Sequence, residues 1–86
     1  MTGEDYRKWA DGYYHEAEVL HRKITEKRRK QFFKTAEERE KNDRAVERLY
    51  AMRVDCLKTH DILMKKAIQI EQIEEMEKRE KHRIHR

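Results

Sequence analysis

The chain has 86 residues, of which 47% are charged and 36% hydrophobic, with no proline and only two glycines. This composition is typical of one small domain of long helices, and a chain of this size buries only a modest part of its surface. The apolar runs are too short to span a membrane, a single cysteine cannot form an internal disulfide, and the acidic N-terminal stretch is not a signal peptide, so we expect a cytoplasmic protein.

The first predicted helix spans about residues 3–34. Thr2 followed by Glu4 and Asp5 is typical of a helix start. Apolar residues then recur in alternating steps of four and three, which is a heptad pattern: Tyr6, Ala10, Tyr13, Ala17, Leu20 and Ile24. Trp9 lies one turn from two of these residues and widens the apolar stripe.

The predicted turn lies at about residues 33–36. Thr35 followed three residues later by Glu38 is a capping-box pattern, which favours a second helix beginning at Ala36. Asn42 or Asp43 offers an alternative cap with a turn at 40–43. Because neither site contains glycine or proline, one continuous helix is a further alternative.

The second predicted helix spans about residues 36–80 and leads into a basic tail at about 78–86. Its apolar stripe is flanked by Val46, Leu57 and Met64. The stripe itself consists of Ala45, Leu49, Met52, Cys56, Thr59 or His60, Leu63, Ala67, Ile70 and Ile73.

Together these elements predict an all-α fold, an antiparallel two-helix hairpin. A turn near residue 35 pairs positions whose numbers sum to about 70, so residues from Ile68 onward have no partner within the chain. A second copy covers them in the predicted homo-oligomer, most simply a dimer forming a four-helix bundle or coiled coil. The predicted self-association residues are Trp9, Met64, Ala67, Ile70, Ile73 and Met76. The acidic residues Glu71, Glu74, Glu75 and Glu77 are expected to face a basic stretch of the neighbour.

Residues 22–35 contain seven basic side chains and one acidic side chain. They predict an alternative function, a nucleic-acid-binding accessory protein that contacts phosphates through Lys27, Arg28, Arg29, Lys30 and Lys34. Phe32 and Phe33 lie in the same run and have rings that can stack on bases. The simpler interpretation is a solvated helix end, partly neutralised by Glu37, Glu38, Glu40 and Glu47.

No pattern in the sequence indicates catalysis. Cys56 and His60 share a helical face, but structural zinc needs four ligands and the chain has no second cysteine. Neither a glycine-rich phosphate loop nor a nucleophile with its base is apparent. We expect no enzyme activity, no metal, no cofactor and no small-molecule substrate.

The segments at residues 6–14 and 49–56, Tyr-Arg-Lys-Trp-Ala-Asp-Gly-Tyr-Tyr and Leu-Tyr-Ala-Met-Arg-Val-Asp-Cys, resemble those of short helical proteins encoded by prophages and mobile elements of Firmicutes. The resemblance covers roughly residues 6–64. It implies an origin and no particular activity. We therefore expect a small helical protein with an interaction or scaffolding role.

Overall fold

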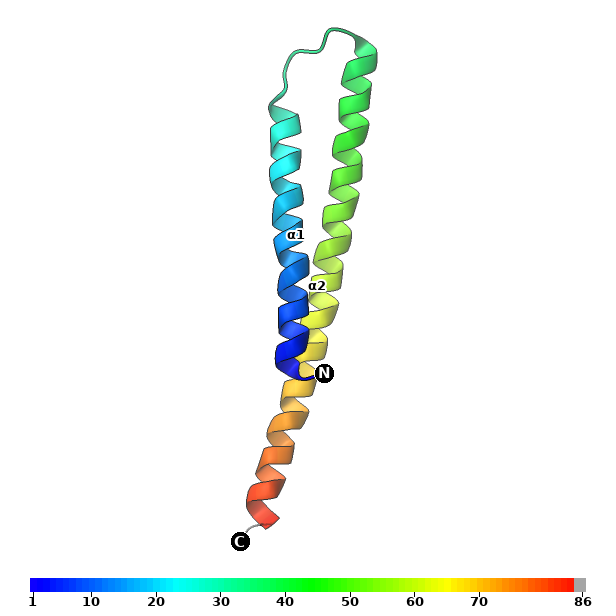
Figure 1. The fold of residues 1–86 in the computed structure, drawn as a ribbon. Helices are drawn as coiled ribbons and strands as arrows, with labels where there is room; N and C mark the ends of the chain where they lie inside the picture. The colour runs from blue at the N-terminus through cyan, green and yellow to red at the C-terminus, as the bar shows by residue number, and fades with distance from the viewer. Residues whose placement is uncertain (85–86) are drawn as a thin grey trace.

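The chain forms two long antiparallel helices joined by one loop (Figure 1). The structure is a computed structural model that describes residues 1–84, with side chains through Lys81. Helix α1 spans Gly3–Arg29 and helix α2 spans Ala36–Ile84, and the described residues contain no strand. The Cα atoms fill a rod of 78 × 14 × 14 Å. The predicted all-α hairpin is therefore confirmed.

A capping box fixes the start of α1. The Asp5 backbone N–H donates to the Thr2 hydroxyl at 3.2 Å, and the Thr2 N–H donates to the Asp5 carboxylate at 2.9 Å. These bonds satisfy donors that a helix end otherwise leaves unpaired. They also lower the pKa of Asp5, chiefly because Thr2 donates to the charged form.

The loop covers residues 30–35, so α1 ends five residues before the predicted end at residue 34. Lys30 leaves the helix with φ −70° and ψ 113°, after three basic residues in the last turn. Sequence reasoning missed this end because no glycine or proline marks it. The residues that follow, including Phe32 and Phe33, have no apolar partner on α1 that favours continuing the helix.

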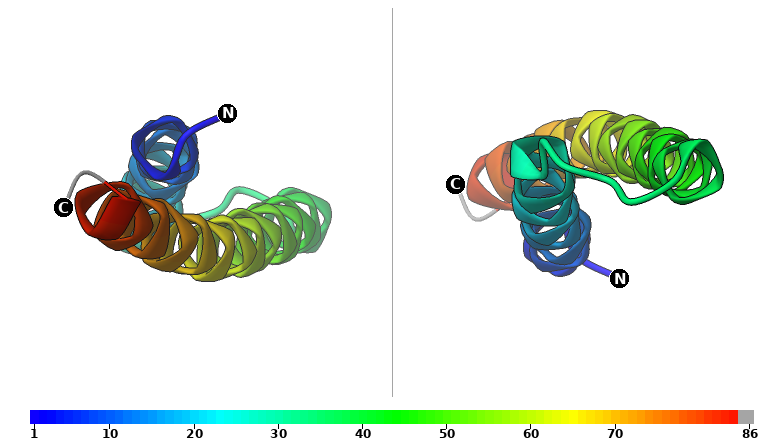
Figure 2. Two further views of the ribbon diagram at one scale, coloured as in Figure 1. Left: turned by 90° about the horizontal axis from the view of Figure 1, so that it is seen from below. Right: turned by 90° about the horizontal axis from the view of Figure 1, so that it is seen from above.

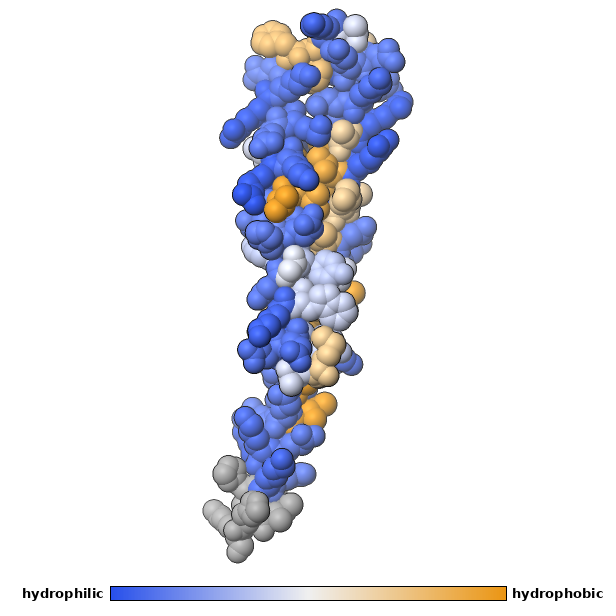
Figure 3. Space-filling model, viewed as in Figure 1, coloured by the Kyte–Doolittle hydropathy of each residue, from blue (hydrophilic) through white to orange (hydrophobic). Residues whose placement is uncertain are grey.

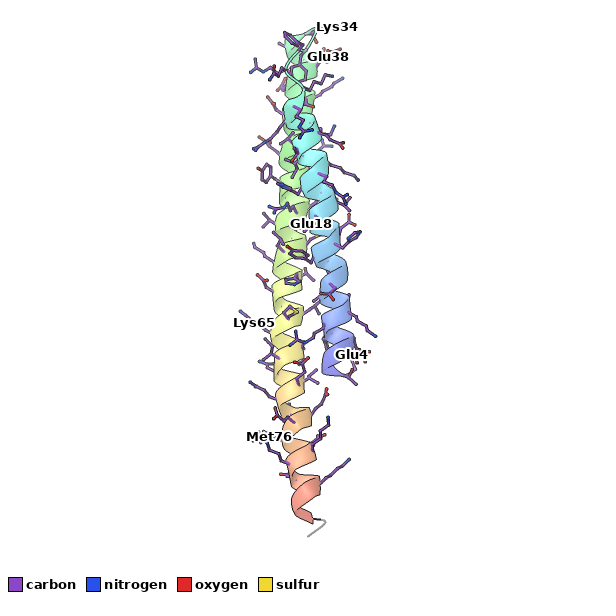
Figure 4. The ribbon with its side chains drawn as sticks, turned by 90° about the vertical axis from the view of Figure 1, so that its left-hand side faces the viewer. Glu4, Glu18, Lys34, Glu38, Lys65 and Met76 are labelled. Atoms are coloured by element: carbon purple, nitrogen blue, oxygen red, sulfur yellow. The ribbon has the colours of Figure 1, made fainter. Side chains whose placement is uncertain are left out.

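Helix α2 begins at Ala36, as the Thr35 cap predicts, and the alternative turn at 40–43 is helical. The Glu38 N–H donates to the Thr35 hydroxyl at 3.1 Å. The Glu38 carboxylate accepts from the N–H of Lys34 at 3.1 Å rather than from Thr35 itself, so the capping box is shifted by one residue (Figure 4).

The register differs from the prediction by about one helical turn. The predicted pairing places Tyr14 near Cys56, whereas the structure places its ring beside that of His60, four residues further along α2. The extended loop causes the shift, because it carries the first turns of α2 past the end of α1 (Figure 1). Viewed along the rod, the two helices also separate toward the loop (Figure 2).

As a result, α1 covers more of α2 than predicted. The Gly3 N–H donates to the Glu74 carboxylate at 2.8 Å, so the uncovered part of α2 does not begin at Ile68. We call residues 75–84 the α2 extension. They continue the helix four residues beyond the predicted end at 80, and of the predicted basic tail only residues 85–86 lie outside the described residues.

The core is a narrow stripe between the helices, made by Ala10, Ala17, Leu20, Ile24, Leu63 and Ala67. The α1 stripe agrees with the predicted heptad. On α2 the predicted stripe is correct only in part. Leu49, Cys56, His60, Leu63, Ala67 and Ile70 are buried or half-buried as predicted, but Met52 and Ile73 are 52% and 55% exposed, and Arg53, which the stripe omitted, is half-buried. The apolar sequence pattern did not indicate the whole inner face, because polar residues occupy some of its heptad positions. Within the described residues, no helix is long and apolar enough to cross a bilayer.

Candidate interaction surface

The hairpin has two flanks, and the one containing Tyr14 is closed by contacts between the helices. Arg7 donates to both carboxylate oxygens of Glu71, with the Nη2–Oε2 distance at 2.8 Å. This donation lowers the pKa of Glu71 and raises that of Arg7, because it stabilises both charged forms. The fork-on-carboxylate geometry fixes how the N-terminal end of α1 sits on α2.

Two aromatic contacts continue this Tyr14 flank toward the loop. The Tyr14 and His60 ring centroids are 5.5 Å apart, and the Arg28 guanidinium lies 4.9 Å from the centre of the Tyr50 ring. The His60 Nδ1 atom also lies 3.1 Å from the Asp61 Oδ1 atom. Side chains of both helices thus contact one another at three levels of this side, while Tyr14 itself remains 50% exposed.

The opposite side, which we call the Trp9 flank, contains an open apolar groove of about 270 Å³. Its lining residues are Trp9, Gly12, Tyr13, Glu16 and Cys56. Trp9 stacks on Tyr6 with ring centroids 6.2 Å apart and remains 49% exposed. A Cβ added to Gly12 would meet nothing within 4 Å, so nothing in the hairpin requires a glycine there.

Exposed apolar side chains of α2 extend the Trp9 flank along the rod. Met52 lies one turn before Cys56 and shares a heptad column with Ile73, and Ile62 and Met76 form the neighbouring column. All four are 52–66% exposed. Figure 3 shows apolar side chains along one face of the rod, between surfaces covered by charged residues.

The structure separates the predicted self-association residues into three groups. Trp9, Ile73 and Met76 are exposed, and Figure 4 shows Met76 on the part of α2 beyond α1. Met64 and Ile70 are half-buried. Ala67 is fully buried against the start of α1, so the prediction that it contacts a second copy is wrong. The register error explains this, because α1 reaches further along α2 than the predicted turn allowed.

Three of the four acidic residues expected to face a neighbour instead pair within the chain. Glu71 binds Arg7, and Glu74 accepts from the Gly3 N–H. Glu75 pairs with Arg79 one turn later on α2. The acidic block of α2 therefore stabilises the open end of its own hairpin first.

The predicted nucleic-acid residues gather at the loop end, as the sequence implies. Four of them lie at or near the end of α1: Lys27, Arg28, Arg29 and Lys30; Lys34 lies in the loop. Three residues of this region, Lys27, Arg28 and Lys30, line a cleft of about 580 Å³ together with Gln31, Phe33, Arg39, Asn42, Asp43, Val46 and Glu47. The Asn42 side chain donates across the base of this region to the Lys27 carbonyl at 3.3 Å.

The glutamates expected to neutralise this basic run partly lie near it, with Glu47 and Glu38 lining clefts beside Lys27 and Lys30, but they form no direct ion pair with it among the described residues. Glu40 pairs with Arg44, and Glu38 accepts from backbone. Within residues 1–81, no ion pair includes a basic side chain of residues 22–34. Phe32 is 88% exposed among these cations, and Lys30 lies 5.2 Å from the centre of the Phe33 ring.

Sequence reasoning also missed Arg53, whose Nε atom is buried without a hydrogen-bond acceptor among the described residues. The heptad pattern could have identified Arg53 as an inner residue, because it lies four residues after Leu49 and three before Cys56. Among the described residues, no group of three or more His, Cys, Asp or Glu side chains could hold a metal. Comparison with protein-family models, curated proteins and solved structures gives no match to this chain.

Proposed function

We propose that this chain is a non-catalytic interaction or scaffolding protein that self-associates through the Trp9 flank, most simply as a homodimer with a four-helix coiled-coil core. The observation that carries the proposal is the set of exposed apolar side chains on one flank, Trp9, Met52, Ile62, Ile73 and Met76, left open in the single hairpin. Fully burying one such side chain stabilises an assembly by roughly 1.5–3 kcal/mol. A cytoplasmic location and a prophage origin belong to this proposal and rest on the sequence alone.

A second copy is the occupant favoured by the flank itself. Two hairpins that present the same flank bury their grooves together, which is the arrangement of most homodimers. The Tyr14 flank supports the choice by contrast, because its side chains already contact one another across the hairpin. In a monomer, the exposed apolar side chains of the Trp9 flank would remain in contact with water.

Sedimentation of the unmutated chain at micromolar concentration tests the proposal, with at least twice the chain mass expected. Replacing Ile73 and Met76 together by Asp should lower the association constant at least tenfold. The matched control replaces Val54 and Ile68 by Asp. These two residues lie on the side of α2 away from the Trp9 flank and are 43% and 45% exposed, so the change should leave association unchanged. A well-folded monomer for the unmutated chain would contradict the proposal.

A second candidate function is binding of single-stranded nucleic acid at the loop end. Its support is the set of basic side chains of residues 22–34 without ion pairs, together with the exposed ring of Phe32. Basic grooves bind phosphates, and exposed aromatic rings stack on bases.

Fluorescence anisotropy with a labelled single-stranded oligonucleotide tests this candidate at low salt. Binding should weaken steeply as salt rises, and charge reversal at Arg28 and Arg29 should abolish it for every sequence. Phe32→Ala should weaken binding several-fold while Phe32→Trp retains it. No binding at low salt would eliminate this function.

A further inference from the structure

The two ends of the rod carry different charge. At the loop end, residues 22–49 contain eleven basic and six acidic side chains. At the other end, residues 1–8 and 71–86 contain seven basic and seven acidic side chains, and the Arg7–Glu71 ion pair holds the start of each segment at one level. The rod is therefore positive at the loop end and close to neutral at the other end, where residues 71–77 hold four acidic side chains and no basic one.

The apolar groove lies near the middle of the rod. Its α2 member is Cys56, close to residue 60, which is the midpoint of α2. Apolar residues flank the groove on both sides, with Met52 toward the loop and Ile62 toward the α2 extension. A two-fold axis through this level brings groove against groove.

We propose that two copies pack side by side in opposite directions, with the two-fold axis crossing the Trp9 flank near residue 60. The proposal rests on the self-association proposed above and adds its geometry. In this arrangement, the basic loop end of each copy lies beside the end of the other copy that carries the acidic block of residues 71–77 and is close to neutral overall. Complementary fields of this kind set the orientation of an interface more than its affinity.

Side chains on the Trp9 flank fit the same orientation. Lys66 shares a heptad column with Met52, and Asp55 shares one with Ile62. Because an antiparallel pair centred on residue 60 matches positions that sum to about 120, Lys66 comes level with Asp55 of the second copy. Arg48, in the column of Asp55, comes level with the acidic N-terminal turn of the second copy's α1.

The parallel alternative is less favourable. It places the two loop ends together, each with five more basic than acidic side chains over residues 22–49, and like charges brought together at an interface oppose association. End-to-end contact through the α2 extensions alone leaves the central groove open.

Distances between spin labels distinguish these arrangements. Three variants in a Cys56→Ser background carry one cysteine each: Glu37→Cys, Lys58→Cys and Gln72→Cys. The three positions are exposed and share one heptad column, so their lateral separation across a dimer is equal. Only their separation along the rod differs.

At a rise of 1.5 Å per residue, the antiparallel dimer separates the two labels along the rod by about 70 Å at residue 37, about 35 Å at residue 72 and about 6 Å at residue 58. A parallel dimer gives nearly the same short distance at all three positions and would overturn the geometry. End-to-end contact gives its shortest distance at residue 72 and would also overturn it.

The outcomes separate this inference from the function on which it rests. Sedimentation of each labelled variant shows whether a dimer is present before any distance is interpreted. A monomer contradicts self-association itself. A dimer with equal distances contradicts the antiparallel geometry alone and leaves self-association standing.

Discussion

Arg7 and Glu71 join the first turns of α1 to a stretch of α2 that lies 64 residues away in sequence. Arg7 Nε and Nη2 donate to the two oxygens of Glu71, and the side chains are 44% and 37% exposed. Three residues later, Glu74 accepts from the Gly3 N–H. The open end of the hairpin is therefore held by polar contacts, where a longer apolar core is absent.

We predict that Glu71→Gln lowers the urea midpoint of unfolding at neutral pH and has no effect in acid. The folded-state pKa of Glu71 is lowered from its ordinary value of 4.5, chiefly by the hydrogen bond from Arg7. A carboxylate of this kind stabilises the fold above its unfolded pKa, and the contribution is lost as pH falls through the folded pKa. Urea titrations of both proteins from neutral pH to about pH 3 measure the difference.

The control for this prediction is Glu80→Gln, which removes an exposed carboxylate without an ion pair among the described residues. It should change the midpoint much less at neutral pH. Because Glu71 is partly exposed, high salt should reduce the effect of Glu71→Gln. An equal effect of Glu71→Gln at every pH would contradict the proposed cause.

The Thr35 cap should contribute more to stability than Asn42. Thr35→Ala removes the acceptor for the Glu38 N–H and should lower the free energy of unfolding by ~1 kcal/mol, whereas Thr35→Ser should retain most of it. Asn42 lies inside α2 and makes one long hydrogen bond at 3.3 Å, so Asn42→Ala should cost less. Thermal unfolding followed by circular dichroism compares the three variants, and a larger loss for Asn42→Ala would contradict the cap assignment.

The features that sequence reasoning predicted correctly have local causes. Thr2 and Thr35 cap the helices through residues within four positions of themselves. The α1 stripe is formed by alanine and aliphatic residues at regular heptad positions, so its period is visible without a partner. Local hydrogen bonds and an uninterrupted period are readable from one chain.

The features that sequence reasoning missed depend on tertiary contacts. The inner face of α2 includes Arg53 and Glu74, which a search for apolar residues rejects. Met52 and Ile73 are apolar and were assigned to the inner face, although they are exposed. The register depends on how far along the rod the extended loop reaches before α2 begins, and no residue in the loop indicates that distance. The candidate site shifted with the register, which is why Ala67 was placed on the surface.

Arg53 should destabilise the hairpin relative to an apolar residue of similar length. Its Nε donor is buried without an acceptor, and an unsatisfied buried donor typically costs about 1–3 kcal/mol. We therefore predict that Arg53→Met raises the free energy of unfolding. Lys65→Met, at an exposed position of the same helix, is the control and should change it little. Chemical denaturation measures both, and a loss of stability in Arg53→Met would show that the guanidinium makes a favourable contact.

Gly12 should have opposite effects on the hairpin and on its association. In the single hairpin, a methyl group at Gly12 meets nothing, and alanine is favoured over glycine inside a helix by roughly 0.5–1 kcal/mol. Gly12→Ala should therefore raise the melting temperature at high dilution, where association is absent.

In the proposed dimer, however, Gly12 lines the groove that receives the second copy, so a bulky side chain there should block close approach. We predict that Gly12→Leu weakens self-association at least tenfold while the hairpin remains folded. His15→Leu adds a similar exposed side chain one turn along α1, away from the groove, and should leave association unchanged. Sedimentation over a concentration series measures the association constants. If Gly12→Leu dimerises as tightly as the unmutated chain, the groove is not the contact surface, because a filled groove cannot accept the same partner side chains.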